Sequence, residues 1–182
     1  IKEKKFTQFK HTPDNPNSLS NNNIWAIHQD NNGILWLGTQ SGLNKFNPKT
    51  NNFYHYKFNS KEFNSLSNDF VLSIYQDKND FLWLGTYSGG LNKFDPKTEN
   101  FTHYTTKNGL SNDVVYGILE DKHEHFWLST NNGISRFNPK TNKFKNYNES
   151  DGVQVKEFGT LAFYKSQSGE LYFGGNNGYI KF

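Results

Sequence analysis

The chain has 182 residues, a net charge of +3 and no cysteine. This length can form one domain with a sizeable core, and the lack of cysteine excludes disulfides and cysteine-based metal sites. The 20 Lys and Arg residues are spread along the chain and form no basic stripe, so nucleic acid is not an expected partner. No apolar run has the length of a membrane-spanning helix, so we expect membrane attachment only through segments outside this sequence.

Short strands and polar turns alternate along the whole chain. In a first segment, 5–10, Phe6 and Phe9 have the spacing of two aromatic residues that recur in later outer strands. Each following unit begins with a polar loop such as SLSN and continues with short strands rich in β-branched and aromatic residues. We expect such units at 18–58, 65–106, 109–147 and 151–182, the last with three strands.

One aromatic position recurs in every unit, at intervals of about 45 residues. Its occupants are Trp36, Trp83, Trp127 and Tyr172. A glycine follows each of them six residues later, as Gly42, Gly89, Gly133 and Gly178. A repeat of this length with one Trp and paired turn glycines is typical of a propeller blade. The sequence therefore predicts an all-β fold, a β-propeller of four-stranded antiparallel blades, with about four blades in this chain.

The fourth unit lacks an outer strand. We expect the segment 5–10 to complete it, because pairing the two ends of the chain removes exposed sheet edges. Three arrangements stay open at this point: a closed four-blade ring, two chains that form eight blades, and a fragment of a larger ring. The chain begins inside a repeat, which favours a mature fragment or an excised domain.

An aspartate precedes the repeated Trp by six residues in three units, as Asp30, Asp77 and Asp121. A short carboxylate at this place can accept backbone N–H groups and fix a tight turn. The residue recurs in unit after unit, whereas a catalytic residue need occur only once, so we interpret it as structural. The same argument assigns the repeated aromatic residues to the core between blades.

The loops that enter the first strands and those that join the second and third strands are expected on one face of the propeller. Propellers usually bind ligands where such loops converge. Trp25 breaks the repeat, because we align it with Val71 and Val115, and its ring can stack on a sugar face. Amides, hydroxyls and a few aromatic rings suit a neutral polyol such as a carbohydrate. The candidate ligand-binding residues are Trp25, Asn22, Asn23, Asn68, Asp69, Tyr87, Asn112, Asp113, Asn131 and Asn176.

The six histidines form no recognisable catalytic pattern. His55 and His103 occupy the same repeat position and are interpreted as ordinary strand residues. His123 and His125 flank Glu124 in a turn, with no fourth ligand in the sequence to complete a metal site. We therefore predict no catalytic residue, no metal site and no cofactor.

The recurring sequence motifs together resemble the two-component regulator propeller repeat, over essentially the whole chain. These motifs are SLSNN, D-x-x-G, LWLGT, GLNKFNP and F-x-HY. The fourth unit, with Asp151, Gly152 and the run YFGGNNG, resembles the atypical last blade of such propellers. This resemblance implies the sensor part of a bacterial hybrid two-component protein, located in the periplasm or outside the cell. In the family an immunoglobulin-like domain, a membrane helix and a histidine kinase normally follow, and the sensors are commonly linked to glycan perception.

Three functions stay open from the sequence. The preferred one is a non-catalytic sensor that binds a carbohydrate or another small polar ligand, which biases the arrangement of blades or subunits. The second is a self-assembling scaffold for protein interactions, for which a homodimer is an expected partner. The third is an enzyme of the streptogramin-lyase type, whose propeller repeats also contain D-x-x-G-x-x-W, but which needs a metal and a His/Glu pair at the channel mouth.

Overall fold

The computed structural model describes residues 6–155 and 157–182. Short β-strands account for nearly all of the regular structure in these residues. The strands are β1 (Ile24–Gln29), β2 (Leu35–Thr39), β3 (Gly42–Asn47), β4 (Asn52–Tyr56), β5 (Val71–Gln76), β6 (Leu82–Thr86), β7 (Leu91–Asp95), β8 (Asn100–Tyr104), β9 (Val115–Glu120), β10 (Phe126–Thr130), β11 (Gly133–Asn138), β12 (Lys143–Tyr147), β13 (Glu157–Lys165), β14 (Leu171–Asn176) and β15 (Gly178–Lys181). Two single 3-10 turns, Thr106–Asn108 and Glu149–Asp151, precede the third and fourth units. Among the described residues, no helix has the length and apolar character needed to cross a membrane.

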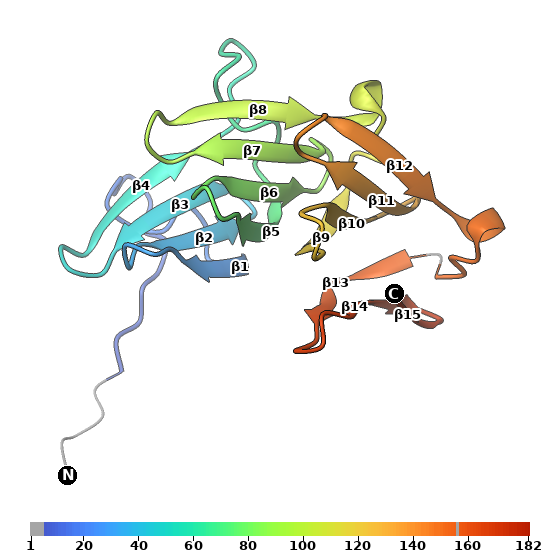
Figure 1. The fold of residues 1–182 in the computed structure, drawn as a ribbon. Helices are drawn as coiled ribbons and strands as arrows, with labels where there is room; N and C mark the ends of the chain where they lie inside the picture. The colour runs from blue at the N-terminus through green and yellow to red at the C-terminus, as the bar shows by residue number, and fades with distance from the viewer. Residues whose placement is uncertain (1–5, 156) are drawn as a thin grey trace.

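The strands form four antiparallel sheets, and within each sheet they lie in sequence order. Blade 1 comprises β1–β4, blade 2 β5–β8, blade 3 β9–β12 and blade 4 β13–β15. The first strands of successive blades lie side by side, and Figure 1 shows the blades following one another along an arc. The predicted all-β propeller is confirmed.

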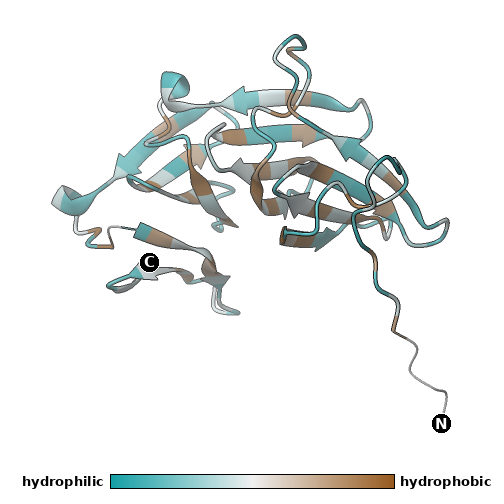
Figure 2. Ribbon diagram, turned by 180° about the vertical axis from the view of Figure 1, so that it is seen from behind, coloured by the Kyte–Doolittle hydropathy of each residue, from teal (hydrophilic) through white to brown (hydrophobic). Residues whose placement is uncertain are grey.

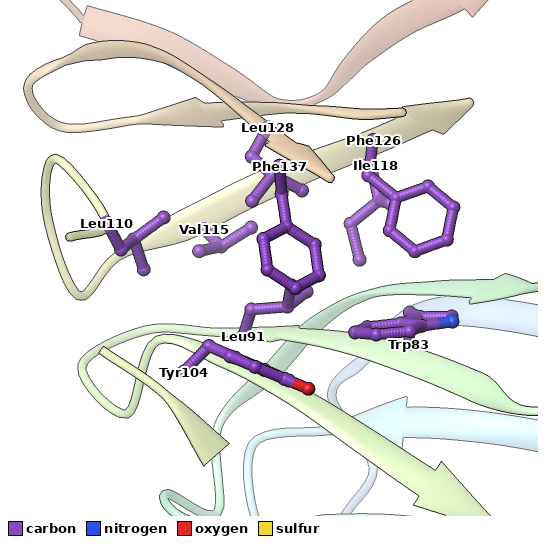
Figure 3. Packing of buried hydrophobic residues seen from close by; sticks show 9 residues of the cluster. All are labelled: Trp83, Leu91, Tyr104, Leu110, Val115, Ile118, Phe126, Leu128 and Phe137. Carbon is purple, nitrogen blue, oxygen red and sulfur yellow. The ribbon is translucent and has the colours of Figure 1, made fainter. Parts of the chain in front are cut away.

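The hydrophobic core lies between the blades and is mainly aromatic. In Figure 3, Trp83 and Tyr104 of blade 2 lie against Phe126 and Phe137 of blade 3. The ring centroid of Trp83 is 4.8 Å from that of Phe126, and the centroid of Tyr104 is 4.8 Å from that of Phe137. In Figure 2 the hydrophobic residues lie mostly within the strands, whereas the connecting loops are largely hydrophilic. Each blade therefore buries its apolar side chains against its neighbour.

One aspartate fixes a turn and satisfies a buried indole in each of the first three blades. The Trp Nε1–H donates to Asp Oδ2 at 2.9 Å in blade 1, 2.8 Å in blade 2 and 2.9 Å in blade 3. In blade 2, Oδ1 of Asp77 also accepts the backbone N–H groups of Asn79 and Phe81. These bonds give the structural interpretation of Asp30, Asp77 and Asp121 its physical basis, because a buried indole N–H without a partner costs about 1–3 kcal/mol.

Blade 4 replaces the aspartate with two residues. Ser166 Oγ accepts the backbone N–H of Glu170, and Oε2 of Glu170 accepts the hydroxyl of Tyr172. Tyr172 thus holds the place of the repeated Trp with a different polar partner.

The turn between the second and third strands requires glycine at one position. Gly42, Gly90 and Gly133 have φ values of +110°, +74° and +78°, and a Cβ on any of them would collide with a carbonyl oxygen of the outer strand. Blade 2 has one extra residue in this turn, so Gly90 takes the role that the constant spacing assigned to Gly89.

The expected outer strand over 5–10 is not formed. Residues 6–10 belong to no strand, and blade 4 has three strands; Lys5 lies outside the described residues. Phe9 lies instead on blade 1, with its ring centroid 4.8 Å from Phe46 and 5.9 Å from Phe53. This aromatic packing holds the segment at the first blade, at the opposite end of the arc from β15 (Figure 1).

We expect Trp83→Ala to lower the free energy of unfolding by about 3–5 kcal/mol, because a fully buried side chain is replaced by a cavity. Denaturant unfolding followed by circular dichroism measures the loss. Tyr54→Ala is the control, because Tyr54 is a largely exposed aromatic residue of β4 and its loss should cost less than about 1 kcal/mol. Equal losses in the two variants would contradict a core role for the repeated Trp.

Candidate ligand-binding face

The entry loops of the first strands meet the turns between the second and third strands on one face of the propeller. We call this the loop face; it comprises residues 18–23, 65–70 and 109–114 together with 40–41, 87–90 and 131–132. In blade 1, Asn23 Nδ2 donates to Gln40 Oε1 at 2.9 Å, and in blade 2, Tyr87 N donates to the carbonyl of Phe70 at 3.0 Å. The loop face therefore has a fixed backbone.

Three aromatic rings form a row on the loop face, across the boundary between blades 1 and 2. The ring centroid of Trp25 in blade 1 is 5.2 Å from that of Phe70, and Phe70 stacks on Tyr87 of its own blade at 5.3 Å with an interplanar angle of 20°. Tyr87 is 50% exposed, and the other two rings are partly exposed. The row offers a ligand an apolar surface whose rings are held in place by their contacts with one another.

Tyr116 of blade 3 lies near the Tyr87 end of this row. Its hydroxyl donates to Asn131 Oδ1 at 2.6 Å. Burial is the main cause that raises the pKa of Tyr116 above its usual value, and the nearby Tyr87 and Glu157 raise it further. This phenol therefore remains a neutral hydrogen-bond donor at physiological pH. Residues of three blades and the first strand of the fourth therefore lie close together on the loop face.

A polar hollow of about 400 Å³ adjoins Asn131, between blade 3 and the segment that leads into blade 4. Amide, carboxylate and small aliphatic groups line it, including Asn131, Asn132, Asn148, Glu149, Val153 and Val155. This volume lies in the range of small-molecule sites. Asn131 joins the hollow to the aromatic row, because it both lines the hollow and accepts the Tyr116 hydroxyl.

Several candidate residues of the sequence analysis already have partners that hold the loops. Asp69 Oδ1 accepts the backbone N–H of Phe58, and Asp113 Oδ1 accepts that of Thr106, each at 2.7 Å. Asn22 Oδ1 accepts the backbone N–H of His11 in the same way. These side chains anchor each entry loop to the segment that precedes it, which explains their recurrence without a ligand.

Other candidate amides are engaged in the same manner. Asn68 donates to Ser88 Oγ and accepts the backbone N–H of Phe70, and Asn112 accepts the backbone N–H of Val114. Asn176 donates to Glu157 Oε2 at 2.7 Å. Of the ten candidates, the structure brings Trp25 and Tyr87 together in the aromatic row, with Asn131 beside Tyr116 at its end.

The alignment of Trp25 with Val71 and Val115 is wrong. Ile24, Val71 and Val115 pair with Thr39, Thr86 and Thr130, so Trp25 corresponds to Leu72 and Tyr116. A bulge follows the first paired residue of each first strand and shifts the side chains by one position. Counting from the SLSN loops would have matched Trp25 to Tyr116 and revealed this second aromatic residue.

The turn that holds His123 and His125 does not form a metal site. Glu124 forms ion pairs with Lys78 of blade 2 and Lys140 of blade 3, and His125 Nδ1 lies 3.4 Å from Asp121 Oδ2. Across residues 6–155 and 157–182, no group of three or more His, Asp or Glu side chains is placed to hold a metal ion. Glu124 instead links two blades.

The sequence profile of the two-component regulator propeller matches residues 18–41, 65–88 and 109–132. Three of the four repeats of this chain therefore match the two-component regulator propeller repeat. Each match covers an entry loop, the first two strands and the following turn, which are the parts that build the loop face. No curated protein matches the chain at a significant level.

Solved structures of extracellular domains from hybrid two-component systems resemble the chain over nearly its full length. The extracellular domain of a hybrid two-component system from B. thetaiotaomicron covers 95% of the chain at 23% identity, with a TM-score of 0.81. That of a second hybrid two-component system from the same organism covers 90% at 26% identity, with a TM-score of 0.71. The chain spans only about a quarter of these proteins, 24% and 25%. The chain thus shares the propeller fold of segments of these extracellular domains.

Virginiamycin B lyase from Staphylococcus aureus is also similar, with a TM-score of 0.61 and 15% identity over 88% of the chain and 55% of the lyase. At this identity the likeness concerns the fold alone.

We expect Glu124→Gln to lower the melting temperature at neutral pH. The hydrogen bonds of Lys140 and Lys78 lower the pKa of Glu124 to about 2 from an unperturbed 4.5. A depressed pKa stabilises the folded state above pH 4.5, and this contribution is lost as the pH falls towards 2. The difference in melting temperature between wild type and variant should therefore narrow between pH 4.5 and pH 2, as measured by scanning fluorimetry.

Salt provides the control for this prediction, because Glu124 and both lysines are accessible to solvent and their attraction is screened at high ionic strength. A difference between wild type and Glu124→Gln that stays constant with both pH and salt would contradict an electrostatic role.

Proposed function

We propose that this chain is a non-catalytic, ligand-binding propeller of an extracytoplasmic sensor in a bacterial two-component system. The observation that carries this proposal is the aromatic row of Trp25, Phe70 and Tyr87 on the loop face of regulator propeller repeats. Surfaces of this kind bind ligands through stacking, and the repeats supply the rigid frame.

A neutral polyol such as a glycan is the ligand class that this surface fits best. The row provides apolar rings, and the adjoining hollow provides amides from Asn131, Asn132 and Asn148. Amide groups can donate to and accept from hydroxyls without a charge. Lys and Arg are absent from the residues that line the hollow, so a strongly anionic ligand is not favoured.

The chemistry of the loop face supports a binding role over a catalytic one. The only adjacent His and Glu in the described turns, at 123–125, lie between the first and second strands of blade 3, away from the loop face, and Glu124 is paired with two lysines. The carboxylates of the entry loops, Asp69 and Asp113, accept backbone N–H groups. A lyase of the streptogramin type would need free acid, base and metal-binding groups at the channel mouth.

The location and the signalling route follow from the proposed family role. The similar B. thetaiotaomicron structures are extracellular domains, which supports a location of this propeller in the periplasm or outside the cell. A ligand that bridges two blades across the row would favour one arrangement of blades, and attached modules would report that change to the cell.

We expect Tyr87→Ala and Trp25→Ala each to weaken glycan binding by roughly tenfold, because each removes a stacking ring worth about 0.5–1.5 kcal/mol beyond its buried area. Wild type is first screened against a panel of neutral oligosaccharides by thermal shift, and the best binder is then titrated calorimetrically. Trp25→Ala should leave the fold intact, because Trp25 is only partly buried, unlike Trp83.

Tyr54→Ala is the matched control, since Tyr54 is 58% exposed but lies on the outer strand β4. Its affinity should equal that of wild type. Binding that is lost equally in all three variants, or a wild type that binds no oligosaccharide of the panel, would overturn the glycan proposal.

A further inference from the structure

The connection from β12 to β13 repeats the connection from β8 to β9 (Figure 1). Each contains one 3-10 turn that follows a capping side chain and ends at a glycine in the left-handed region. The residue after this glycine donates its backbone N–H to the carbonyl of the capping residue, at 3.3 Å in the earlier connection and 3.0 Å in the later one. That residue is Leu110 in the earlier connection and Val153 in the later one, so the two side chains occupy the same position. Two residues further along, Asn112 corresponds to Val155.

These two positions are filled differently in the two connections. Leu110 is 3% exposed and belongs to the core between blades 2 and 3, whereas the shorter Val153 is partly exposed. Asn112 accepts the backbone N–H of Val114, whereas Val155 is buried and presents only methyl groups. The two valines are part of the lining of the 400 Å³ hollow beside Asn131. The connection into blade 4 therefore leaves space where its counterpart is filled, and gives this space an apolar wall.

Amide groups complete the lining of the hollow. Asn131 Oδ1 accepts the Tyr116 hydroxyl, and Asn148 Oδ1 accepts both the backbone N–H and the hydroxyl of Ser150. Asn132 Nδ2 donates to a backbone carbonyl at 3.4 Å. Among the described residues, the Nδ2 groups of Asn131 and Asn148 and the Oδ1 atom of Asn132 have no hydrogen-bond partner. The hollow thus offers two donors and one acceptor close to methyl groups.

An acetamido group matches this set of partners. Its carbonyl can accept from one of the Nδ2 groups, its N–H can donate to the Oδ1 atom of Asn132, and its methyl group can lie against the valines. A hydroxyl in the same place would use the amides but leave the valines in contact with water. An ammonium group would find one carboxylate in the lining, that of the exposed Glu149. The lining therefore favours an acetamido group over either alternative.

We propose that this hollow is a subsite for the acetamido group of an N-acetylated hexosamine, within a glycan that extends along the aromatic row. This inference rests on the proposed glycan-binding function. A volume of about 400 Å³ is sufficient for one sugar unit with its substituent. Asn131 lines the hollow and contacts Tyr116, which lies near Tyr87, so the hollow and the Tyr87 ring can contact neighbouring units of one oligosaccharide.

The test compares sugars that differ only at carbon 2, in one series built on glucose and one built on galactose. Each series comprises the methyl glycosides of the N-acetylated sugar, the parent sugar and the amino sugar with an ammonium group. They are titrated against the 182-residue chain and followed by NMR chemical shifts. We expect the N-acetylated member of at least one series to bind about tenfold more tightly than its two relatives, because it adds a buried methyl contact and a hydrogen bond.

The outcomes separate this inference from the proposed function. Equal affinity of the N-acetylated and parent sugars in both series would overturn the subsite and leave glycan binding standing. Tighter binding of the amino sugars would also overturn it, because Glu149 would then select a positive charge. A chain that binds none of these sugars but binds another oligosaccharide of the panel would again overturn only the subsite. No binding of any sugar would overturn the glycan proposal as well.

Two variants test the two kinds of contact. Val153→Thr exchanges a methyl group for a hydroxyl at nearly the same volume. Asn131→Asp removes the Nδ2 donor of an exposed residue but keeps the oxygen that accepts the Tyr116 hydroxyl. Each variant should lower the preference for the N-acetylated sugar over its parent by at least about threefold. Tyr87→Ala should change the affinities of both sugars by one common factor and leave the preference unchanged.

Asn142→Asp is the matched control, since Asn142 Oδ1 accepts the hydroxyl of Tyr104 in the same way. Asn142 lies in the turn between β11 and β12, away from the loop face, so this variant should show the preference of wild type. A preference that stays unchanged in both Val153→Thr and Asn131→Asp, at melting temperatures near that of wild type, would place the acetamido group elsewhere and overturn the proposal.

Discussion

The packing of aromatic rings between neighbouring blades is the interaction on which the rest of this structure depends. Trp83 and Tyr104 of blade 2 lie on Phe126 and Phe137 of blade 3, and Trp36 and Tyr56 lie on the equivalent positions of blade 2. Three of the four hydrophobic clusters of the described residues combine side chains of two neighbouring blades, whereas the cluster of Leu19, Leu37, Phe46 and Phe53 lies within blade 1. A four-stranded sheet has two apolar faces that must be buried. In a repeat array, each blade buries a face of the blade that follows it.

Function on such a scaffold arises where the repeat is broken. The recurring polar residues of the entry loops are bound to the neighbouring segments, as with Asp69 to Phe58 and Asp113 to Thr106. Phe70 and Tyr87 have no aromatic counterpart in blades 1 and 3, and they form a surface together with Trp25, whose position Tyr116 takes in blade 3. The regular residues therefore build the frame, whereas the irregular ones give this particular propeller its surface.

The fold was predictable from the sequence because each blade repeats the same short sequence motifs. The period near 45 residues, the repeated Trp and the turn glycines were enough to place most strands. The site was less predictable. Trp25 was aligned one residue away from its counterparts, so Tyr116 was missed, and Phe70 stands where the other entry loops have Asn23 and Val114. The position of 6–10 was mistaken because the spacing of Phe6 and Phe9 indicates an outer strand but not the blade that it covers.

The arc of blades also determines how the segment of four blades opens when it is studied by itself. Among the described residues, blades 2 and 3 are covered on both sides, whereas blade 4 has one neighbouring blade and three strands. In a linear array of this kind, local opening starts at the end with the fewest contacts and proceeds inward, one unit at a time. Amide protons of β14 and β15 would then exchange with solvent before those of β6 and β7. A contact that covers blade 4 would therefore slow this opening and raise the stability of the four blades.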